Sequence, residues 1–502
     1  MAIIIFCAKF MGLFREVIIA GIYGQSYASD ILNSATQIPL LFFDMTLGVA
    51  ILSTFVPIFN GYLEKEGRER AILFANNFMS AVVSLATVFA VLGVIFAKQI
   101  VGLMCPGYAP EKIAETAQLL RIIFPSIIFT AAAYTSVGIL QSFGEFNIPS
   151  IISVVSNLIM ILYLAVFGNR FGLTGVIVSM FVAWAAQLFV QLPHLKKFGY
   201  HYKPTLKFRD EGLMSAAKLA VPVLISSWVQ PLCAVVNMAF GSSLGNGAVS
   251  GLNWANKIYI IMVGVFAYAV TNFIFPKLSR MNAGDKNDAF SETTRLSVGW
   301  TVFIIGYIAA MFIALSRPII RLVFEHGAFT AENTALTATA LLNYSIGMMG
   351  YAICEILNKS FYAIQDGKTP MLTSIAGVVI NLASAFILVG VLKMGVGGLA
   401  LSSAISSIFM ACVLLCLMNK KRPGTFGKSF AVNLSKIIFC SVAAGLTATI
   451  VYSFAENLGG GKVITFVQLC ISAAPALIIY AVAALVFKPD EIRQIRRFGH
   501  EK

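Results

Sequence analysis

Long apolar stretches recur along the whole chain, and their length constrains the fold more than any other feature of the sequence. A helix needs about 20 apolar residues to cross the hydrocarbon core of a bilayer. Stretches of that length occur fourteen times in the 502 residues, with approximate bounds 2–23, 30–60, 72–97, 112–141, 147–168, 172–195, 213–242, 247–278, 289–316, 331–363, 370–392, 396–418, 431–456 and 463–487. The pattern predicts an all-α integral membrane protein with fourteen transmembrane helices.

The composition agrees with this class. Hydrophobic residues make up 58% of the chain and charged residues 12%, whereas soluble domains carry about 25% charged residues. The basic excess, 36 Lys and Arg against 22 Asp and Glu, falls in short loops, with 21 bases on one side of the predicted spans and 7 on the other. This asymmetry predicts that both termini are cytoplasmic, and it explains the charge without a nucleic-acid partner. The first apolar stretch is too long and too charged for a cleaved signal, so we expect it to remain as a helix.

An internal repeat of about 220 residues organises the chain. Matching landmarks are separated by 219 residues for Pro57 and Pro276, 220 for Gly107 and Gly327, and 221 for Pro149 and Pro370. Six spans separate the copies, so both have the same topology and are expected to be related by a pseudo-two-fold axis along the membrane normal. The repeat predicts two six-helix lobes, residues 1–205 and 206–425, with a cavity between them. Residues 426–502 then form two additional helices and a cytoplasmic tail.

Ionised side chains inside the first span need a paired or wet setting. Lys9, Arg15 and Glu16 lie in this span, and each charge at mid-bilayer costs about 2.5–3.5 kcal/mol on insertion scales. Lys9, Gly12 and Glu16 share one helix face, where Gly12 allows another backbone to approach closely. One interpretation is a structural Lys9–Glu16 pair with Arg15 reaching an interface. The other, which we favour, is a helix that lines a polar cavity inside the bundle.

Charges in later spans support the cavity interpretation. Asp30 and Asp44 lie in the second span, and Lys257 lies ten residues into the eighth. Together with Lys9 and Arg15 they predict a cavity that is basic toward the membrane interior, which suits an anionic substrate. Asp44 either balances a nearby base or serves as a proton or cation site.

Cysteine and histidine residues do not form a recognisable chemical motif. All of the eight cysteines except Cys105 lie in apolar spans, and the four histidines are scattered in predicted loops or the tail. No cofactor or metal site is predicted. Cys105, in a predicted outer loop, is expected to react readily with a thiol reagent added from outside.

Several motifs resemble one known family. AKFMGLFREVIIAGIYG (8–24) is followed by Asp30, by QIP (37–39) and by STFVPIF (53–59). Further matches are GILQSFGEFNIP (138–149), NWANKI (253–258) and KSFYAIQDGKTP (359–370). These segments are similar to the MurJ (MviN) lipid II flippases of the multidrug/oligosaccharidyl-lipid/polysaccharide exporter superfamily. The resemblance implies a V-shaped bundle that carries lipid II, the undecaprenyl-diphosphate-linked peptidoglycan precursor, from the inner to the outer leaflet of a bacterial cell membrane by alternating access.

The resemblance also implies site residues. Lys9, Arg15 and Lys257 would meet the diphosphate and sugar head, and Glu16 and Asp30 would complete the substrate site. Helices 13 and 14 would form a groove for the lipid tail. Many members carry two arginines in the second helix, where this chain has Phe43 and Asp44. At positions where the family resemblance implies acids for cation coupling, this chain has Asn237 and Asn381, so sodium coupling is not supported.

Two other functions fit parts of the pattern. A related exporter would move another polyprenyl-linked glycan or drugs through the same lobes. A membrane glycosyltransferase or polymerase would need an acid or base on a sizeable outer loop. The outer loops are short and offer only Glu111, Glu325 and His326. We therefore predict a transporter and not an enzyme, with lipid II and membrane lipids as its partners; the sequence identifies no protein partner.

Overall fold

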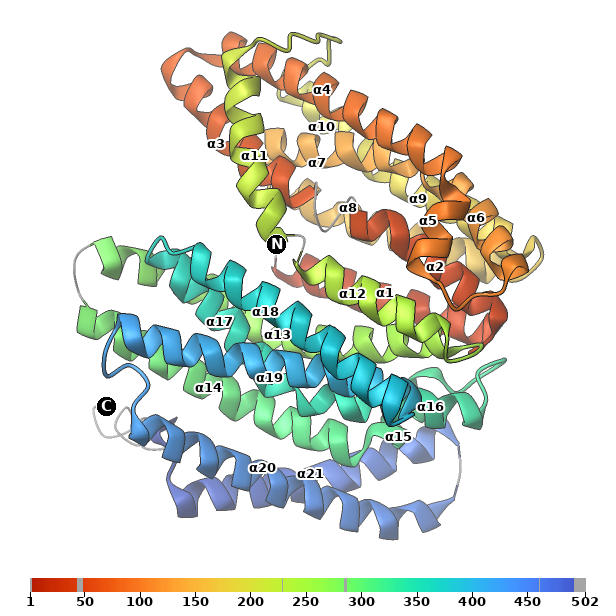
Figure 1. Cartoon of the computed structure of the whole chain (residues 1–502), viewed down its shortest axis with the longest axis vertical. Coiled ribbons are helices and arrows are strands. Elements are labelled where there is room, and N and C mark those ends of the chain that lie inside the picture. Colours follow the sequence, from red (N-terminus) through yellow and green to blue (C-terminus); the bar gives the residue numbers. More distant parts are fainter. Residues whose placement is uncertain (1, 43–47, 228, 284–286, 460, 492–502) are drawn as a thin grey trace. The chain divides into compact units, whose positions relative to one another are not determined.

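The computed structural model describes residues 2–42, 48–227, 229–283, 287–459 and 461–491 (Figure 1). It is 86% helical, and these ranges contain no strand. The all-α integral membrane fold predicted from the sequence is therefore confirmed. The chain divides into two compact units, Met1–Ser250 and Gly251–Lys502. The three predicted segments, with boundaries at 205/206 and 425/426, stay predictions.

The first unit contains the helices from α1 to α12. Their bounds are α1 (Ala2–Tyr23), α2 (Tyr27–Phe42), α3 (Val49–Lys65), α4 (Arg68–Ile95), α5 (Ala97–Met104), α6 (Pro110–Ile123), α7 (Ser126–Ser142), α8 (Asn147–Phe167), α9 (Gly172–Phe189), α10 (Leu192–Lys197), α11 (Glu211–Ser227) and α12 (Val229–Ser242). In this unit α8 packs against α1 and α9, and α7 packs against α3, α4 and α9.

The second unit contains most of α13 (Ala248–Ala283), whose first turn belongs to the first unit. The remaining elements are α14 (Asn287–Ala314), α15 (Ser316–Phe324), α16 (Ala331–Ile346), α17 (Met348–Ala363), α18 (Lys368–Ala385), the π-helix η2 (Phe386–Val391), α19 (Gly395–Lys421), α20 (Lys428–Ala455), the 3₁₀ turn η3 (Glu456–Leu458) and α21 (Lys462–Phe487). Figure 1 shows α20 and α21 side by side, and α20 also packs on α14.

Many of these helices are long and apolar enough to span a bilayer. In the described ranges nine helices qualify singly, and eleven spans result if two bent pairs are each counted as one. The three other predicted spans correspond to α1, to α2 with α3, and to α11 with α12. α1 carries three ionised residues, and the other two spans are each divided into two shorter helices. The predicted count of fourteen is consistent with these elements but is not confirmed by them.

The order of elements repeats along the chain, as the sequence landmarks predict. α4 and α14 both have 28 residues, and each is followed by a short helix, a bent pair and two further helices. Gly107 and Gly327 both lie in the turn after the short helix, and Pro149 and Pro370 are each the third residue of the next long helix. The repeat therefore holds for the elements as well as for the sequence.

The two bent pairs break for different reasons. α6 and α7 meet at 41° around Pro125, which lacks the backbone donor that would continue the helix. α16 and α17 meet at 48° at Gly347. A Cβ on Gly347 would lie 2.5 Å from Cα of Ala404 in α19, so only glycine permits this close approach.

Candidate functional site

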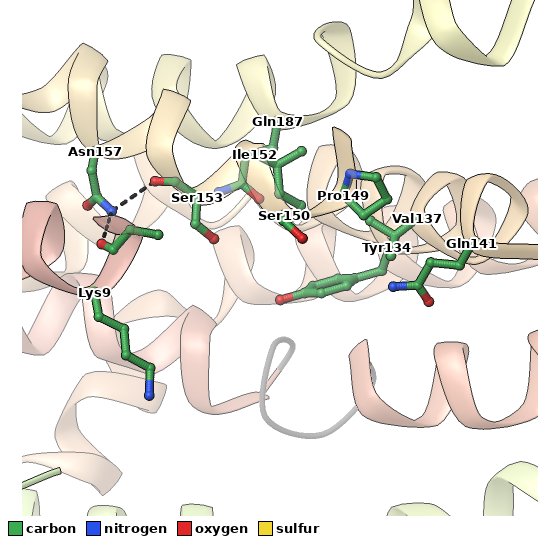
Figure 2. A pocket seen from close by; sticks show the side chains of 11 residues that line it. Lys9, Tyr134, Val137, Gln141, Pro149, Ser150, Ile152, Ser153, Asn157 and Gln187 are labelled. Carbon is green, nitrogen blue, oxygen red and sulfur yellow. Dashed lines mark hydrogen bonds between the residues drawn. The ribbon is translucent and has the colours of Figure 1, made fainter. Parts of the chain in front are cut away.

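A pocket of about 520 Å³ opens in the first unit among α1, α7, α8 and α9 (Figure 2). It is lined by Ala8 and Lys9 of α1, by Tyr134, Val137 and Gln141 of α7, by Pro149, Ser150, Ile152, Ser153 and Asn157 of α8, and by Gln187 of α9. Most of these side chains are polar, and no carboxylate is among the residues that line the pocket. The volume lies within the range of about 300–1,000 Å³ that small-molecule pockets occupy.

Lys9 is the charged residue of this lining. It lies in the second turn of α1 and is neither fully buried nor fully exposed. Figure 2 shows its ammonium group extended away from α8, at one end of the row of labelled side chains, with Tyr134 and Gln141 toward the other end. The pocket therefore combines one cation with several uncharged hydrogen-bonding groups.

Arg15 is held against α8. Its Nη1 donates to Oδ1 of Asn157 at 3.0 Å, and its Nη2 lies 2.7 Å from Oε1 of Glu16. Glu16 is 4% exposed, so this ion pair neutralises a nearly buried carboxylate. Asn157 also donates through Nδ2 to the carbonyl oxygens of Ala8 and Ser153. Arg15 does not reach outward to an interface; it fastens α1 to α8.

Gly12 lies on the same side of α1, where a Cβ would meet the Asn157 amide at 3.7 Å, an ordinary contact distance. The neighbour of this helix face is α8, but the contact is with a side chain at an ordinary distance, so the predicted close approach of a second backbone stays a prediction. α1 and α8 pack along each other in the first unit. Arg15 thus contacts α8 through Asn157, whereas Lys9 lines the pocket beside that helix.

Asp30 lies in a separate buried group. Its Oδ2 lies 3.0 Å from Nζ of Lys112 and accepts the backbone N–H of Gly247 at 2.8 Å, and its Oδ1 accepts the N–H of Ser250 at 2.9 Å. Lys112 also donates to Oδ1 of Asn246. We call Asp30, Lys112, Asn246, Gly247 and Ser250 the Asp30 cluster. Asp30 is 0% exposed and Lys112 4% exposed, and the carboxylate stands at the N-terminus of α13, where negative charge is favoured.

Cys105 lies beside this cluster and is buried. Its Sγ donates to Oγ of Ser34 at 3.7 Å, and Ser34 also bonds Tyr108 Oη at 2.8 Å. Burial raises the pKa of the Cys105 thiol to about 11. The expectation of a readily reactive, exposed thiol is therefore wrong, because the turn after α5 packs onto α2 instead of standing in solvent.

The other predicted site residues lie apart from the pocket lining. Asn237 is in α12, and Lys257 is in α13, within the second unit. Asn381 is buried in α18, and its Nδ2 lies 3.3 Å from the hydroxyl oxygens of Ser402 and Ser403 in α19. Asp44 falls outside the described residues. The roles of all eight predicted site residues stay predictions.

An apolar groove of about 470 Å³ is present in the second unit. Its walls come from α14, from the junction of α16 with α17, and from α20, and they include Ala310, Ile346, Met349, Val442 and Leu446. The resemblance implies a tail groove formed by helices 13 and 14. α20 corresponds to helix 13 and contributes one wall, whereas α21 does not line this groove.

Several residues at these sites are not among the residues predicted from the sequence. Gln141, Asn157 and Gln187 were not singled out, although a carboxamide inside an apolar span is a usable signal of a polar contact. Lys112 was counted only as a loop base, and its pairing with Asp30, 82 residues away, has no local signal. Among the described residues, no group of three His, Cys, Asp or Glu side chains is arranged to hold a metal ion.

The fold and the pocket define a class of protein. A helical, multi-spanning membrane protein built from an internal repeat, with a polar pocket among its helices, has the architecture of a membrane transporter. A family model described as "Lipid II flippase MurJ" matches residues 19–468, and the chain belongs to this family.

Known relatives agree over nearly the full length. The "Probable lipid II flippase MurJ" of Rhizobium meliloti (strain 1021) is 27% identical over 98% of this chain and 93% of the relative. The solved structure "Lipid II flippase MurJ, inward closed conformation" has a TM-score of 0.82 and 25% identity, covering 98% of this chain and 99% of that one. An inward-facing multidrug resistance MATE family transporter of the MOP superfamily, with a TM-score of 0.67 and 15% identity over 83% of this chain and 95% of that one, shares the fold alone.

Proposed function

We propose that this protein is a flippase that moves lipid II from the inner to the outer leaflet of the bacterial cell membrane by alternating access. Membership of the MurJ family and the similarity to relatives described as lipid II flippases support this substrate. The protein acts by transport and not by covalent chemistry. The excess of 21 over 7 bases in alternate loops supports cytoplasmic termini.

The observation that carries the proposal is the chemistry of the pocket in the first unit. Lys9 supplies a cation beside uncharged donors and acceptors, and no carboxylate lines the same space. A diphosphate joined to sugars and a peptide presents negative charge at one end and neutral polar groups at the other. A lysine bonded to a phosphate makes a charge-assisted hydrogen bond, which is stronger than a neutral one.

The other charged residues take supporting roles in this proposal. Arg15, held by Glu16 and Asn157, fixes α1 against α8 beside the pocket. Lys257 contributes a further cation from α13. Asp30 orders the first turn of α13. The apolar groove beside α20 is suited to a polyprenyl chain, because it is lined mainly by aliphatic side chains.

The test is complementation of a strain depleted of its own lipid II flippase. The wild-type chain is expected to restore growth and to release lipid II that has accumulated on the inner leaflet. Lys9→Met is expected to fail at normal protein level. Lys98→Met removes an exposed lysine in the first turn of α5 and is the matched control, which is expected to complement. Normal growth without movement of lipid II to the outer leaflet would reject the proposal.

The same strain distinguishes the alternative of an exporter for drugs or another polyprenyl-linked glycan. Such an exporter would leave inner-leaflet lipid II unchanged while altering drug resistance or a different surface glycan.

A further inference from the structure

The polar side chains that line the pocket in the first unit differ in how many hydrogen bonds they make to other protein atoms. Asn157 makes three hydrogen bonds, to Arg15, Ala8 and Ser153, and the hydroxyl of Ser150 donates to the carbonyl of Phe146. These two side chains have their hydrogen-bonding capacity largely occupied. They hold the wall of the pocket together and leave little for a ligand.

Three other side chains of the lining remain open. Within the described part of the chain, the carboxamides of Gln141 and Gln187 and the hydroxyl of Ser153 make no hydrogen bond to protein atoms. They come from α7, α9 and α8, so three helices each contribute one polar group to the same space. Figure 2 shows Ser153 and Gln187 near the middle of the labelled row and Gln141 at the end away from Lys9.

The chemistry of these groups selects a class of ligand. A carboxamide offers donors and an acceptor in one plane and carries no charge. An amide group on a ligand presents the complementary acceptor and donor, so one carboxamide can form paired hydrogen bonds with it. Polar groups in a membrane-embedded bundle are costly unless they find such partners. An anion alone would bind Lys9 but would leave these three groups without a matching partner.

We propose that Gln141, Ser153 and Gln187 form a neutral subsite that hydrogen-bonds amide groups of the transported head, while Lys9 contacts its diphosphate. The amide groups come either from the acetylated amino sugars or from the peptide. This inference rests on the proposed function and assigns a selectivity to its pocket: the protein distinguishes a complete head from a bare lipid diphosphate.

Three lipids separate the contributions: undecaprenyl diphosphate, the same lipid carrying one N-acetylated sugar, and complete lipid II. Binding of each lipid to the purified full-length protein in detergent is measured by native mass spectrometry. The wild-type protein is expected to bind the amide-bearing lipids more tightly than undecaprenyl diphosphate. A gain with the single sugar assigns the contact to the sugar amide, and a gain only with lipid II assigns it to the peptide.

Gln141→Met and Gln187→Met remove the donors and acceptor while keeping an unbranched side chain. Each is expected to weaken binding of amide-bearing lipid about three- to tenfold, the value of one neutral hydrogen bond. Undecaprenyl diphosphate is expected to bind as in the wild type. Ser153→Ala is expected to fold like the wild type, because Ser153 is exposed. Gln118→Met, exposed on α6 and outside the pocket, is the matched control and is expected to change nothing.

Two results would overturn the subsite. One is equal binding of all three lipids by the wild-type protein, which leaves the flippase proposal standing. The other is an equal loss of binding for all three lipids in Gln141→Met, Gln187→Met and Ser153→Ala. If the wild-type protein bound none of the lipids, both the subsite and the proposed function would be wrong.

Discussion

At the scale of single residues, the two cations of α1 differ in their surroundings. Lys9 lines the pocket, whereas Arg15 is engaged by Asn157 and by the nearly buried carboxylate of Glu16. Substitutions at the two positions should therefore have different effects. A change at Lys9 should weaken substrate binding, and a change at Arg15 should also destabilise the fold.

Lys9→Met is expected to weaken head-group binding about 10- to 150-fold, because a charge-assisted hydrogen bond to phosphate is worth about 1.5–3 kcal/mol. Lys9→Arg should retain transport, since a guanidinium also binds phosphate. Binding of lipid II and unfolding of the same purified samples provide the measurement, with Lys98→Met as the control. Unchanged binding in Lys9→Met would remove this residue from the site.

Arg15→Met is expected to lower the free energy of unfolding, by as much as about 3–5 kcal/mol if the pair behaves as fully buried, because Glu16 would keep an unpaired charge. The double variant Arg15→Met with Glu16→Gln should recover much of that stability. Unfolding of the single and double variants in one detergent is the measurement. An Arg15→Met protein as stable as the wild type would show that the pair does not stabilise the fold.

Some features of these residues could be predicted from the sequence and others could not. Charges inside an apolar span were sufficient to single out Lys9, Arg15 and Glu16, and the helical period placed Gly12 on the face that meets α8. The period does not say which helix is the neighbour. Asn157 lies 142 residues from Arg15, and Ser250 lies 220 residues from Asp30, so these contacts follow only from the tertiary fold.

At the scale of elements, the Asp30 cluster ties α2, α6 and the first turn of α13 together in the first unit. Asp30→Asn removes the negative charge and leaves Lys112 buried without its ion pair. We expect the neighbouring turn to loosen and Cys105 to react with a small thiol reagent at least several times faster than in the wild type. The rate should rise with pH in both proteins, because the thiolate is the reactive form.

The control for this experiment is a background in which the exposed cysteines, Cys7, Cys412, Cys416 and Cys470, are replaced by alanine. Equal and slow labelling of Cys105 in Asp30→Asn and in the parent would show that the cluster does not hold this turn.

Glu491 illustrates how the chain after α21 attaches to the second unit. Both carboxylate oxygens accept from Nδ2 of Asn433 in α20, and a Cβ on Gly299 of α14 would lie 2.2 Å from Oε1. Burial raises the pKa of this carboxyl above its usual range. Since the folded state favours the protonated acid, the contribution of Glu491 to stability is greatest below the pKa of the unfolded chain and is lost as pH rises through the folded pKa.

Glu491→Gln keeps the shape of the side chain and removes the charge. It is expected to raise the unfolding temperature at pH 8 and to change it little at pH 4. Scans of both proteins across this range provide the measurement. A lower unfolding temperature for Glu491→Gln at pH 8 would mean that the charge itself stabilises the attachment.

The elements themselves were largely predictable. Apolar length predicted the long helices, and the repeat predicted their order in α4–α9 and α14–α19. The bend at Pro125 has a local cause, because proline lacks the backbone donor that continues a helix. The bend at Gly347 was not predicted, since it depends on the close approach of Ala404 from another helix.

At the scale of the whole molecule, outward movement of the lipid head carries charge across the membrane. The diphosphate brings about two negative charges, and moving each across the membrane is worth about 2.3 kcal/mol per 100 mV. An interior-negative potential of about 100 mV therefore favours export by roughly 4.6 kcal/mol. Cationic residues that move with the head would reduce this value. In proteoliposomes without ion gradients, the accumulation of lipid II on the outer leaflet should increase with an interior-negative potential. Accumulation that does not depend on the size or the sign of the potential would contradict this expectation.

The most direct measurement is transport by the purified protein alone. Full-length protein is reconstituted into liposomes with labelled lipid II in the inner leaflet, and outer-leaflet lipid II is followed with a membrane-impermeant modifying reagent. Labelled lipid II is expected to appear rapidly in the outer leaflet with the wild type and Lys98→Met, and near the protein-free rate with Lys9→Met. Two results would contradict transport that depends on Lys9. One is a protein-free rate with folded wild-type protein under an interior-negative potential, and the other is an equal rate for the wild type and Lys9→Met.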